Sequence, residues 1–297
     1  MAQSERIPSL QPGETSVSFE LVETTLGELE GQLPHGFLTA DGSRREVVFE
    51  RATVALAKKR GELKQDQGLV KKTGQLFAHW LGMSISRLGQ HDLAGERNMK
   101  QRALKVAELT FADFLFLMIA YHRAAKPGGY AMKGLSCGIC GIDWPEVNVK
   151  FDTLKVSALP PDASLANPPL VRVGLHHGFE YPKGETVRTV LLKPPSFMTS
   201  VWPLTAQEWD NTVALGAALI EASVVQVDTV DIGKFMKLPP GIIDTWMEED
   251  LNLCNEALGR ITPTLDLRLD VQCPSCGELN EALVDWRSPG FMQAFLK

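Results

Sequence analysis

The pattern Cys-x-x-Cys-Gly occurs twice in this chain, as Cys137-Gly-Ile-Cys140-Gly141 and as Cys273-Pro-Ser-Cys276-Gly277. The two-residue spacer lets both thiolates of one copy face a single metal ion, and the glycine can adopt the left-handed conformation that the tight turn needs. Two such knuckles supply four sulfurs, which is the ligand set of a closed, tetrahedral structural zinc site. We therefore predict one structural Zn²⁺ per chain, held by Cys137, Cys140, Cys273 and Cys276.

The spacing between the two knuckles affects what such an ion would do. Between Cys140 and Cys273 lie 132 residues, far more than in a compact zinc ribbon, so a shared ion would join the two halves of the chain. Two unconnected reduced pairs, or a site that no longer holds metal, are the alternatives. A thioredoxin-like redox pair is disfavoured, because neither motif lies between a clear strand and helix of a βαβ unit. Cys254 lies on an apolar helix face and is predicted to be an inert core residue.

Composition excludes several classes of protein. The chain has 297 residues, of which 44% are hydrophobic and 22% charged, enough to build a core without disulfide bonds and too apolar for a disordered polymer. A net charge of -6 without a basic block argues against binding to nucleic acid. The longest apolar run, Phe114–Tyr121, is too short to span a bilayer, and the N-terminus lacks a hydrophobic signal core. We expect no membrane span and a reducing cytosol.

Outward from the knuckles, the sequence predicts an α+β protein with helical regions, a small β region and a zinc-ribbon-like site built from the two distant knuckles. Residues 1–45 are predicted to form an extended N-terminal arm and residues 46–135 a helical domain. A β-rich region with the first knuckle is expected over 136–200, and helices, a strand, the second knuckle and a C-terminal strand over 201–297. Each half has helices, then a knuckle, then a strand. The sequence identity between the halves is too low to prove a duplication.

Periodicity gives the individual elements. Apolar spacing of three and four residues predicts helices over 47–59, 69–88, 110–121, 205–222 and 243–258, with Gly259 as the last stop. Two of these begin with a capping box or a similar pair, Thr110 with Asp113 and Thr205 with Glu208. Alternation of apolar and polar residues predicts strands over 16–22, 147–151, 170–175, 187–192 and 265–271.

Other candidates for chemistry are few. His176 and His177 are the only paired histidines, and we interpret them as surface residues, because adjacent strand residues point to opposite faces and cannot easily share a metal. The acids of Trp246-Met-Glu-Glu-Asp250 are interpreted as a solvated helix face. The chain has no glycine-rich phosphate loop, no Gly-x-Ser-x-Gly elbow and no His-Glu-x-x-His, and no residue set supplies a nucleophile, a base and an orienting group. We predict that it is not an enzyme.

Several motifs occur in a familiar order, and both knuckles are among them. They are Leu33-Pro-His-Gly-Phe37, Leu109-Thr-Phe-Ala-Asp113-Phe-Leu-Phe-Leu117, Leu135-Ser-Cys-Gly-Ile-Cys140-Gly, Leu267-Arg-Leu-Asp-Val-Gln-Cys-Pro-Ser-Cys276-Gly, and a hydrophobic finish at Trp286 and Phe291. Over residues 33–292 the chain resembles the T-even-type baseplate hub assembly chaperones of contractile phage tails and phage-derived injection devices. Family members commonly have Asp-Arg where this chain has Asp113-Phe114, so that match is partial. Residues 160–201 match nothing in the family and are interpreted as a lineage-specific insertion.

The resemblance implies a non-enzymatic tail protein that acts in virion or injection-system assembly. It would be an assembly chaperone or a permanent baseplate or tail-hub component, located in the virion tail or in the host cytoplasm during assembly. Its partners would be other tail or baseplate proteins, and its oligomeric state stays open. Glycine and proline breaks and short apolar strands predict that the arm at 1–45 and the segment 160–200 dock on these partners, with packing of both segments on their own domain as the alternative. The alternatives are an intracellular zinc-ribbon adaptor for nucleic acid or a polymerase, which acids near the knuckles argue against, and a thiol redox protein.

Overall fold

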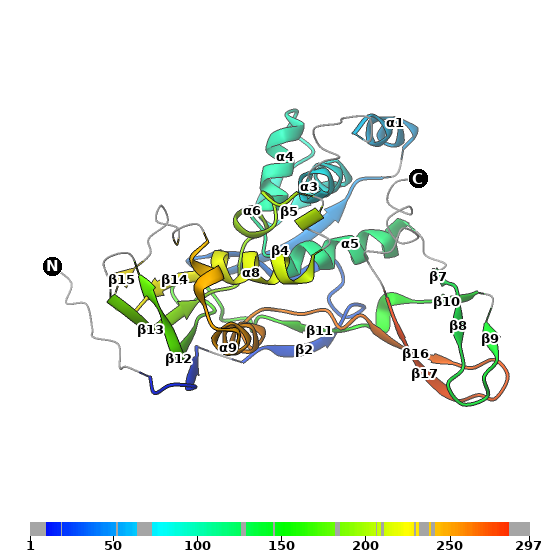
Figure 1. Cartoon of the computed structure of the whole chain (residues 1–297). Coiled ribbons are helices and arrows are strands. Elements are labelled where there is room, and N and C mark those ends of the chain that lie inside the picture. The colour runs from blue at the N-terminus through cyan, green and yellow to red at the C-terminus, as the bar shows by residue number, and fades with distance from the viewer. Residues whose placement is uncertain are drawn as a thin grey trace.

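The structure is a computed structural model (Figure 1). It describes residues 10–284 except for 19, 52, 64–72, 126–128, 145, 182–184, 206, 209–210, 229, 232–237 and 239–240. Helices and several separate sheets alternate along the chain, so the fold is mixed α and β. No helix in these ranges is both long enough and apolar enough to cross a membrane.

The first half is built on a four-stranded sheet of order β3-β4-β5-β6. Its strands are β3 (Gln32–Thr39), β4 (Gly42–Phe49), β5 (Ile85–Leu88) and β6 (His91–Asp92). Helices α1 (Val54–Leu63) and α3 (Thr73–Ser84) connect β4 to β5, and helices α4 (Met99–Ala107) and α5 (Phe111–Ala125) follow β6. The first knuckle comes next, in β7 (Tyr130–Met132), β8 (Leu135–Ser136), β9 (Asp143–Trp144) and β10 (Val147–Val149).

The second half is built on a sheet of order β1-β12-β13-β14-β15. Its strands are β1 (Thr15–Val17), β12 (Val171–Tyr181), β13 (Glu185–Leu192), β14 (Val224–Val227) and β15 (Val230–Asp231). The helices are α6 (Phe197–Ser200), α8 (Thr212–Ser223), the 3₁₀ turn η2 (Ile242–Thr245) and α9 (Glu248–Gly259). The second knuckle joins β16 (Arg268–Gln272) to β17 (Leu279–Leu283), while β2 (Val22–Thr25) pairs with β11 (Lys155–Ala158), which follows η1 (Phe151–Thr153).

The two halves repeat one connectivity: a hairpin, helices, two further strands, two further helical segments and a cysteine knuckle. The repeat extends to strand register. In the first half Val47 faces Leu88, and the register shifts by one residue before Phe49 faces Ile85. In the second half β13 and β14 pair with the same shift, at the positions that correspond to these. Because each irregularity recurs at the same place, the structure reveals an internal duplication that sequence identity could not establish.

The junction between helix and strand is repeated as well. Helix α3 ends at Ser84 and α8 at Ser223, and each hydroxyl donates to the carbonyl oxygen four residues earlier, at 2.7 and 2.6 Å. Each serine carbonyl then accepts the backbone N–H of the residue that follows the hairpin, Glu50 at 2.8 Å and Lys193 at 2.9 Å. The same hydrogen bonds therefore turn each helix into its sheet.

Two hydrophobic cores correspond to the two sheets. The larger core contains α3, α5 and the buried faces of both knuckle hairpins, and it includes Phe197 and Leu215 from the second half. The smaller core lies between β12–β14 and helices α8 and α9, with Phe179 stacked on Trp246 at a centroid distance of 4.6 Å. Both knuckles therefore share the core of the first half, which places them beside each other.

Several predicted elements are confirmed. The helix predicted at Thr110 is α5, and the Thr110 hydroxyl accepts the backbone N–H of Asp113 at 3.1 Å. The Thr205–Glu208 capping box forms in both directions, but the helix predicted over 205–222 is interrupted, because Asn211 is extended and caps α8, which begins at Thr212. The helix predicted over 243–258 is likewise divided into η2 and α9 by the extended Trp246 and Met247, although α9 ends at Gly259 as expected. The predicted strands appear as β1, β10, β12, β13 and β16, with somewhat different bounds.

Two other predicted helices are strand over part of their length. Residues 47–49 belong to β4, and the helix that follows begins only at Val54. Ile85–Leu88 are strand β5, while 64–72 lie outside the described residues. In both places a short run of apolar residues is compatible with the periodicity of a helix and with that of a strand. Both runs are strands because β4 and β5 pair with each other. The pair Trp286 and Phe291 also lies outside the described residues.

The extended arm and the inserted segment were also misjudged. Of residues 10–45, Thr15–Val17 pair with β12 and Gln32–Thr39 form an inner part of the first half. Segment 160–201 contains the hairpin of β12 and β13, which is joined to β14 through β13, just as the hairpin of β3 and β4 is joined to β5 through β4. This segment is a structural equivalent of 32–49 and not an insertion into the fold.

Candidate metal centre

Each knuckle is a tight turn set by backbone hydrogen bonds. The N–H of Cys137 donates to the carbonyl of Ile142 at 2.9 Å, and the N–H of Gly141 donates back to Cys137 at 3.0 Å. The second knuckle has the same pair, from Cys273 to Glu278 and from Gly277 to Cys273, at 2.8 and 3.0 Å. Gly141 and Gly277 have φ values of 69° and 78°, the left-handed conformation predicted for them.

The structure brings the four predicted ligands together. All four sulfurs lie within 4.8 Å of one another. The pairs across the knuckles, Cys137 with Cys276 and Cys140 with Cys273, are both 3.7 Å apart. Four sulfurs about 2.3 Å from one ion at tetrahedral angles would be about 3.8 Å from each other. The spacing therefore fits a single tetrahedral metal ion, and the four cysteines are close enough to hold one.

The site has a buried and an exposed side. The first cysteine of each knuckle, Cys137 and Cys273, is 2% exposed, whereas Cys140 and Cys276 are exposed. Backbone N–H groups of Cys140 and Ile139 point at the Cys137 sulfur at 3.4 Å. The pKa of the Cys137 thiol is lowered to about 6, chiefly by the N–H of Cys140. A thiolate is the form that binds metal, so this geometry prepares the ligand.

One side chain links the knuckles directly. The N–H of Gly138, inside the first knuckle, donates to Oδ1 of Asn280 on β17 at 2.9 Å. The corresponding residue of the second knuckle is Pro274, which has no N–H, and the position that corresponds to Asn280 holds the buried Trp144. The hydrogen bond to Asn280 therefore forms at the first knuckle, where Gly138 has an N–H, and has no counterpart at the second, where Pro274 has none.

Sequence reasoning missed a buried carboxylate in the first half. Asp113 on α5 is fully buried, and its two oxygens accept the N–H groups of His35 and Gly36, each at 2.9 Å. Gly36 has a φ of 71°, and the pairing of β3 with β4 is irregular over the same residues. The carboxylate thus satisfies the backbone donors that the kinked strand cannot pair. We call this arrangement the first carboxylate lock.

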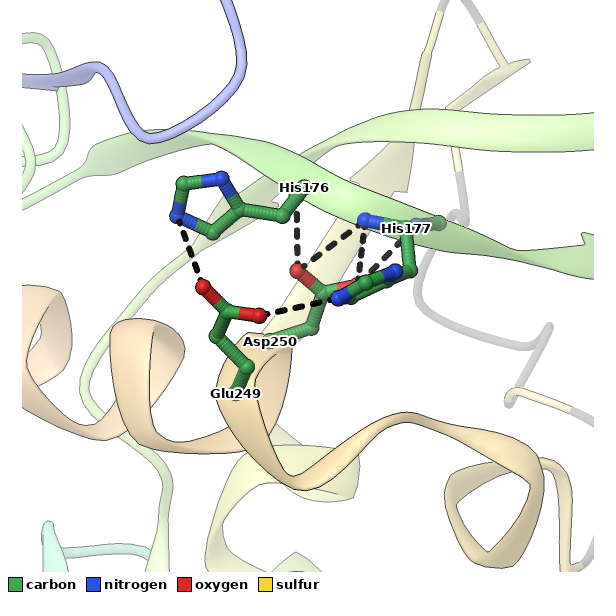
Figure 2. A network of polar contacts seen from close by, with 5 residues as sticks. His176, His177, Glu249 and Asp250 are labelled. Carbon is green, nitrogen blue, oxygen red and sulfur yellow. Dashed lines mark hydrogen bonds and ion pairs between the residues drawn. The ribbon is translucent and has the colours of Figure 1, made fainter.

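The second half contains the same lock (Figure 2). Asp250 on α9 is 1% exposed and accepts the N–H groups of His176, His177 and Gly178, at 2.7, 3.1 and 2.9 Å. Gly178 has a φ of 72°, and β12 is irregular at this point. The prediction that Asp250 lies on a solvated helix face is wrong, because the kinked strand needs its carboxylate.

A sequence signal for both locks exists. The kinked strand of the first lock is Leu33-Pro-His-Gly-Phe37, and that of the second lock is Leu175-His-His-Gly-Phe179. The pattern Leu-x-His-Gly-Phe therefore occurs twice. The third residue of the last helix before the knuckle is aspartate in both halves, Asp113 in α5 and Asp250 in α9. Aligning the halves on these residues would have located both locks.

His176 and His177 are exposed, as expected, but the expectation that their side chains point to opposite faces is wrong. Because β12 is kinked at Gly178, the two rings do not point to opposite faces. Nε2 of His177 lies 2.9 Å from Glu249, and Nε2 of His176 lies 3.8 Å from the other oxygen of the same carboxylate. Cys254, in contrast, is fully buried, and burial raises the pKa of its thiol to about 12, as expected of an inert core cysteine.

No known protein family, no curated protein and no solved structure matches this chain. The function proposed below is therefore inferred from the sequence motifs and from the geometry of the cysteine site.

Proposed function

We propose that this chain is a non-enzymatic protein of a contractile phage tail or phage-derived injection device, acting at the baseplate or tail hub as an assembly chaperone or as a permanent component. One observation carries the proposal. Of the motifs on which the resemblance rests, Leu33-Pro-His-Gly-Phe37 contacts Asp113 in the first lock, and the two cysteine knuckles contact each other. These motifs therefore have structural roles in the fold, as we expect for a family whose members are not enzymes.

We further propose that the metal is zinc and that its role is structural. Four thiolates fill a tetrahedral coordination sphere, so no position is left for substrate or for an activated water. Tetrahedral sulfur sites hold zinc or iron, and the closed site joined to a hydrophobic core is the usual setting of structural zinc. Elemental analysis of protein purified without chelator tests this: we expect one zinc per chain, and iron or no metal would refute it.

The charge near the knuckles supports a protein partner over nucleic acid. Acidic side chains there are Asp143, Glu146, Asp270, Glu278 and Glu281, against the cations Lys133, Lys150, Arg268 and Arg287, of which Arg287 lies outside the described residues. Two of those cations are already paired, Lys133 with Glu146 at 3.3 Å and Arg268 with Asp266 at 2.8 Å. Phosphate binding depends on free cations that displace counterions. In an anisotropy titration at low salt we expect no binding to DNA or RNA, and micromolar, salt-sensitive binding would favour the adaptor alternative.

The deciding experiment uses native particles. Tails or injection devices are purified from cells that express the chain, and its presence is tested in assembly intermediates and in mature particles. We expect it in intermediates in either role, and in mature particles only if it is a permanent component. Complementation with Cys273→Ser should lower the yield of particles, while Cys254→Ser should not. Normal particle assembly without the chain would refute the proposal.

A further inference from the structure

The second lock carries side chains that its structural role does not require. Pairing the halves on Gly36 with Gly178 and on Asp113 with Asp250 aligns Pro34, His35 and Ala112 with His176, His177 and Glu249. In the first half these positions hold no exposed polar cluster, and His35 is buried. A lock therefore functions without two exposed imidazoles and a glutamate, so the fold alone does not account for them in the second half.

These three side chains gather at one accessible point (Figure 2). Each oxygen of Glu249 faces one imidazole, with Nε2 of His177 at 2.9 Å and Nε2 of His176 at 3.8 Å. The side chains of His176 and His177 are 37% and 46% exposed, and that of Glu249 is 62% exposed. A small ion can therefore reach each of them from solvent. Among the described residues only the four cysteines already lie close enough together to hold one ion, so these three side chains must turn to share one.

The backbone beneath the cluster is fixed. Asp250, next to Glu249 in α9, holds the N–H groups of both histidines, so one buried carboxylate sets the positions from which all three side chains project. The His176 ring is held further by Gly13, since a Cβ on Gly13 would be only 2.8 Å from its Cε1. His177 and Glu249 are the members that can turn.

We propose that His176, His177 and Glu249 form a second metal site, for a divalent first-row transition ion bound by two imidazoles and one carboxylate. Nitrogen and oxygen ligands of this kind suit Zn²⁺, Ni²⁺ and Cu²⁺, whereas the four thiolates make a separate, sulfur-only site. The two rings stand on either side of the carboxylate. Binding therefore replaces the contact of His177 with Glu249, and the exposed His177 ring and the Glu249 side chain turn toward the ion that His176 faces. Three protein ligands leave coordination positions open to water or to a partner's side chain.

The test is a titration of full-length protein with Ni²⁺ after the cysteine site has been saturated with zinc and excess metal removed. Isothermal calorimetry should give one Ni²⁺ per chain. Each of His176→Gln, His177→Gln and Glu249→Gln should weaken binding by at least about tenfold, since even the loss of an outer-shell partner costs a metal site that much. Asp250 is left intact, and a near-wild-type NMR spectrum would show that each variant keeps the fold.

A matched control comes from the first half. His91 lies 4.0 Å from Glu108 and forms a pair of one imidazole and one carboxylate. His91→Gln should leave the nickel affinity unchanged, and paramagnetic broadening by Ni²⁺ should affect the ring signals of His176 and His177 but not those of His91.

Equal affinity in the wild type and in Glu249→Gln, equal broadening at all histidines, or no binding would overturn the proposal. Nickel–thiolate absorption bands would show instead that the ion had entered the cysteine site. Because zinc content is measured separately, failure here is distinguishable from failure of the proposed function.

Discussion

The two carboxylate locks perform one task in different surroundings. In both, an aspartate at the start of a helix accepts the backbone N–H groups of a strand kinked at a left-handed glycine. The first lock lies inside the larger core, and its histidine is buried; the second opens to solvent through His176 and His177. The backbone requirement therefore fixes only the glycine and the aspartate. The residues around them are free to join a core in one half and to acquire surface chemistry in the other.

At the knuckles the two halves of the chain contact each other. Each contributes one buried and one exposed cysteine to a common centre. A chain with two cores needs a contact that fixes the halves relative to each other, and the four cysteines that could hold one ion lie at the point where the hairpins meet (Figure 1).

The largest expected effect tests whether the halves contribute equally to the centre. Cys137→Ser and Cys273→Ser should each abolish stoichiometric zinc and lower the free energy of unfolding by roughly 5 kcal/mol. This is less than the about 10–16 kcal/mol with which small peptides bind structural zinc, because two hydrophobic cores remain. Urea unfolding with metal analysis measures both, and Cys254→Ser, mildly destabilising as a core change, should retain the zinc. A large loss from only one of the two knuckle variants would break the symmetry argument.

The next effect separates the two locks. Asp113→Ala leaves two buried N–H groups without acceptors, at about 1–3 kcal/mol each, so we expect a loss of about 3–5 kcal/mol. Asp250→Ala should lose less, about 1–3 kcal/mol, because water can reach the partly exposed backbone of His176 and His177. Urea midpoints rank the two, with the asparagine variants intermediate. A greater loss at Asp250 would show that burial does not determine the strength of a lock.

The first lock should also respond to pH. Burial lowers the pKa of His35, so the unfolded chain binds more protons than the folded protein below the ordinary histidine value of about 6.5. Stability should therefore fall as the pH drops through that value, by at most about 1.4 kcal/mol per pH unit. Burial raises the pKa of Asp113, so its ionisation destabilises the folded state as the pH rises from 3.8 to the raised pKa.

Urea midpoints between pH 7.5 and 5 measure the histidine contribution. His35→Asn should flatten the slope, and His79→Asn on α3, outside both locks, is the matched control. An unchanged slope in His35→Asn would assign the pH dependence to other groups.

The smallest effect concerns the single polar link between the knuckles. Asn280→Ala removes the acceptor of the Gly138 N–H and should weaken metal binding by about tenfold, the lower end of the effect of outer-shell partners. Competition with a colorimetric chelator measures the affinity. Pro274→Ala, which adds a donor to the second knuckle without an acceptor opposite it, should change the affinity little. A larger effect at Pro274 would show that turn rigidity matters more than the link.

The sequence alone determined which four cysteines could hold a metal ion, and much of the local structure. The two Cys-x-x-Cys-Gly motifs specify their own turns through spacing and a left-handed glycine, so all four ligands were predictable without knowing what lies between them. Helix starts at Thr110 and Thr205 followed from capping residues that act within one turn. Turns and helix caps depend only on residues that are close in the sequence, so they can be predicted from it.

Only the tertiary structure decided the rest. Val47–Phe49 and Ile85–Leu88 are strands because they pair with each other across the helices that separate them, a contact that neither stretch encodes by itself. Asp113 and Asp250 lie next to their strands only after folding. The sequence around each aspartate therefore does not show that its carboxylate accepts hydrogen bonds from a kinked strand. Long-range pairing and burial set these assignments: the paired strand residues are 36 to 41 positions apart, and each aspartate is more than 70 positions from the N–H groups that it accepts.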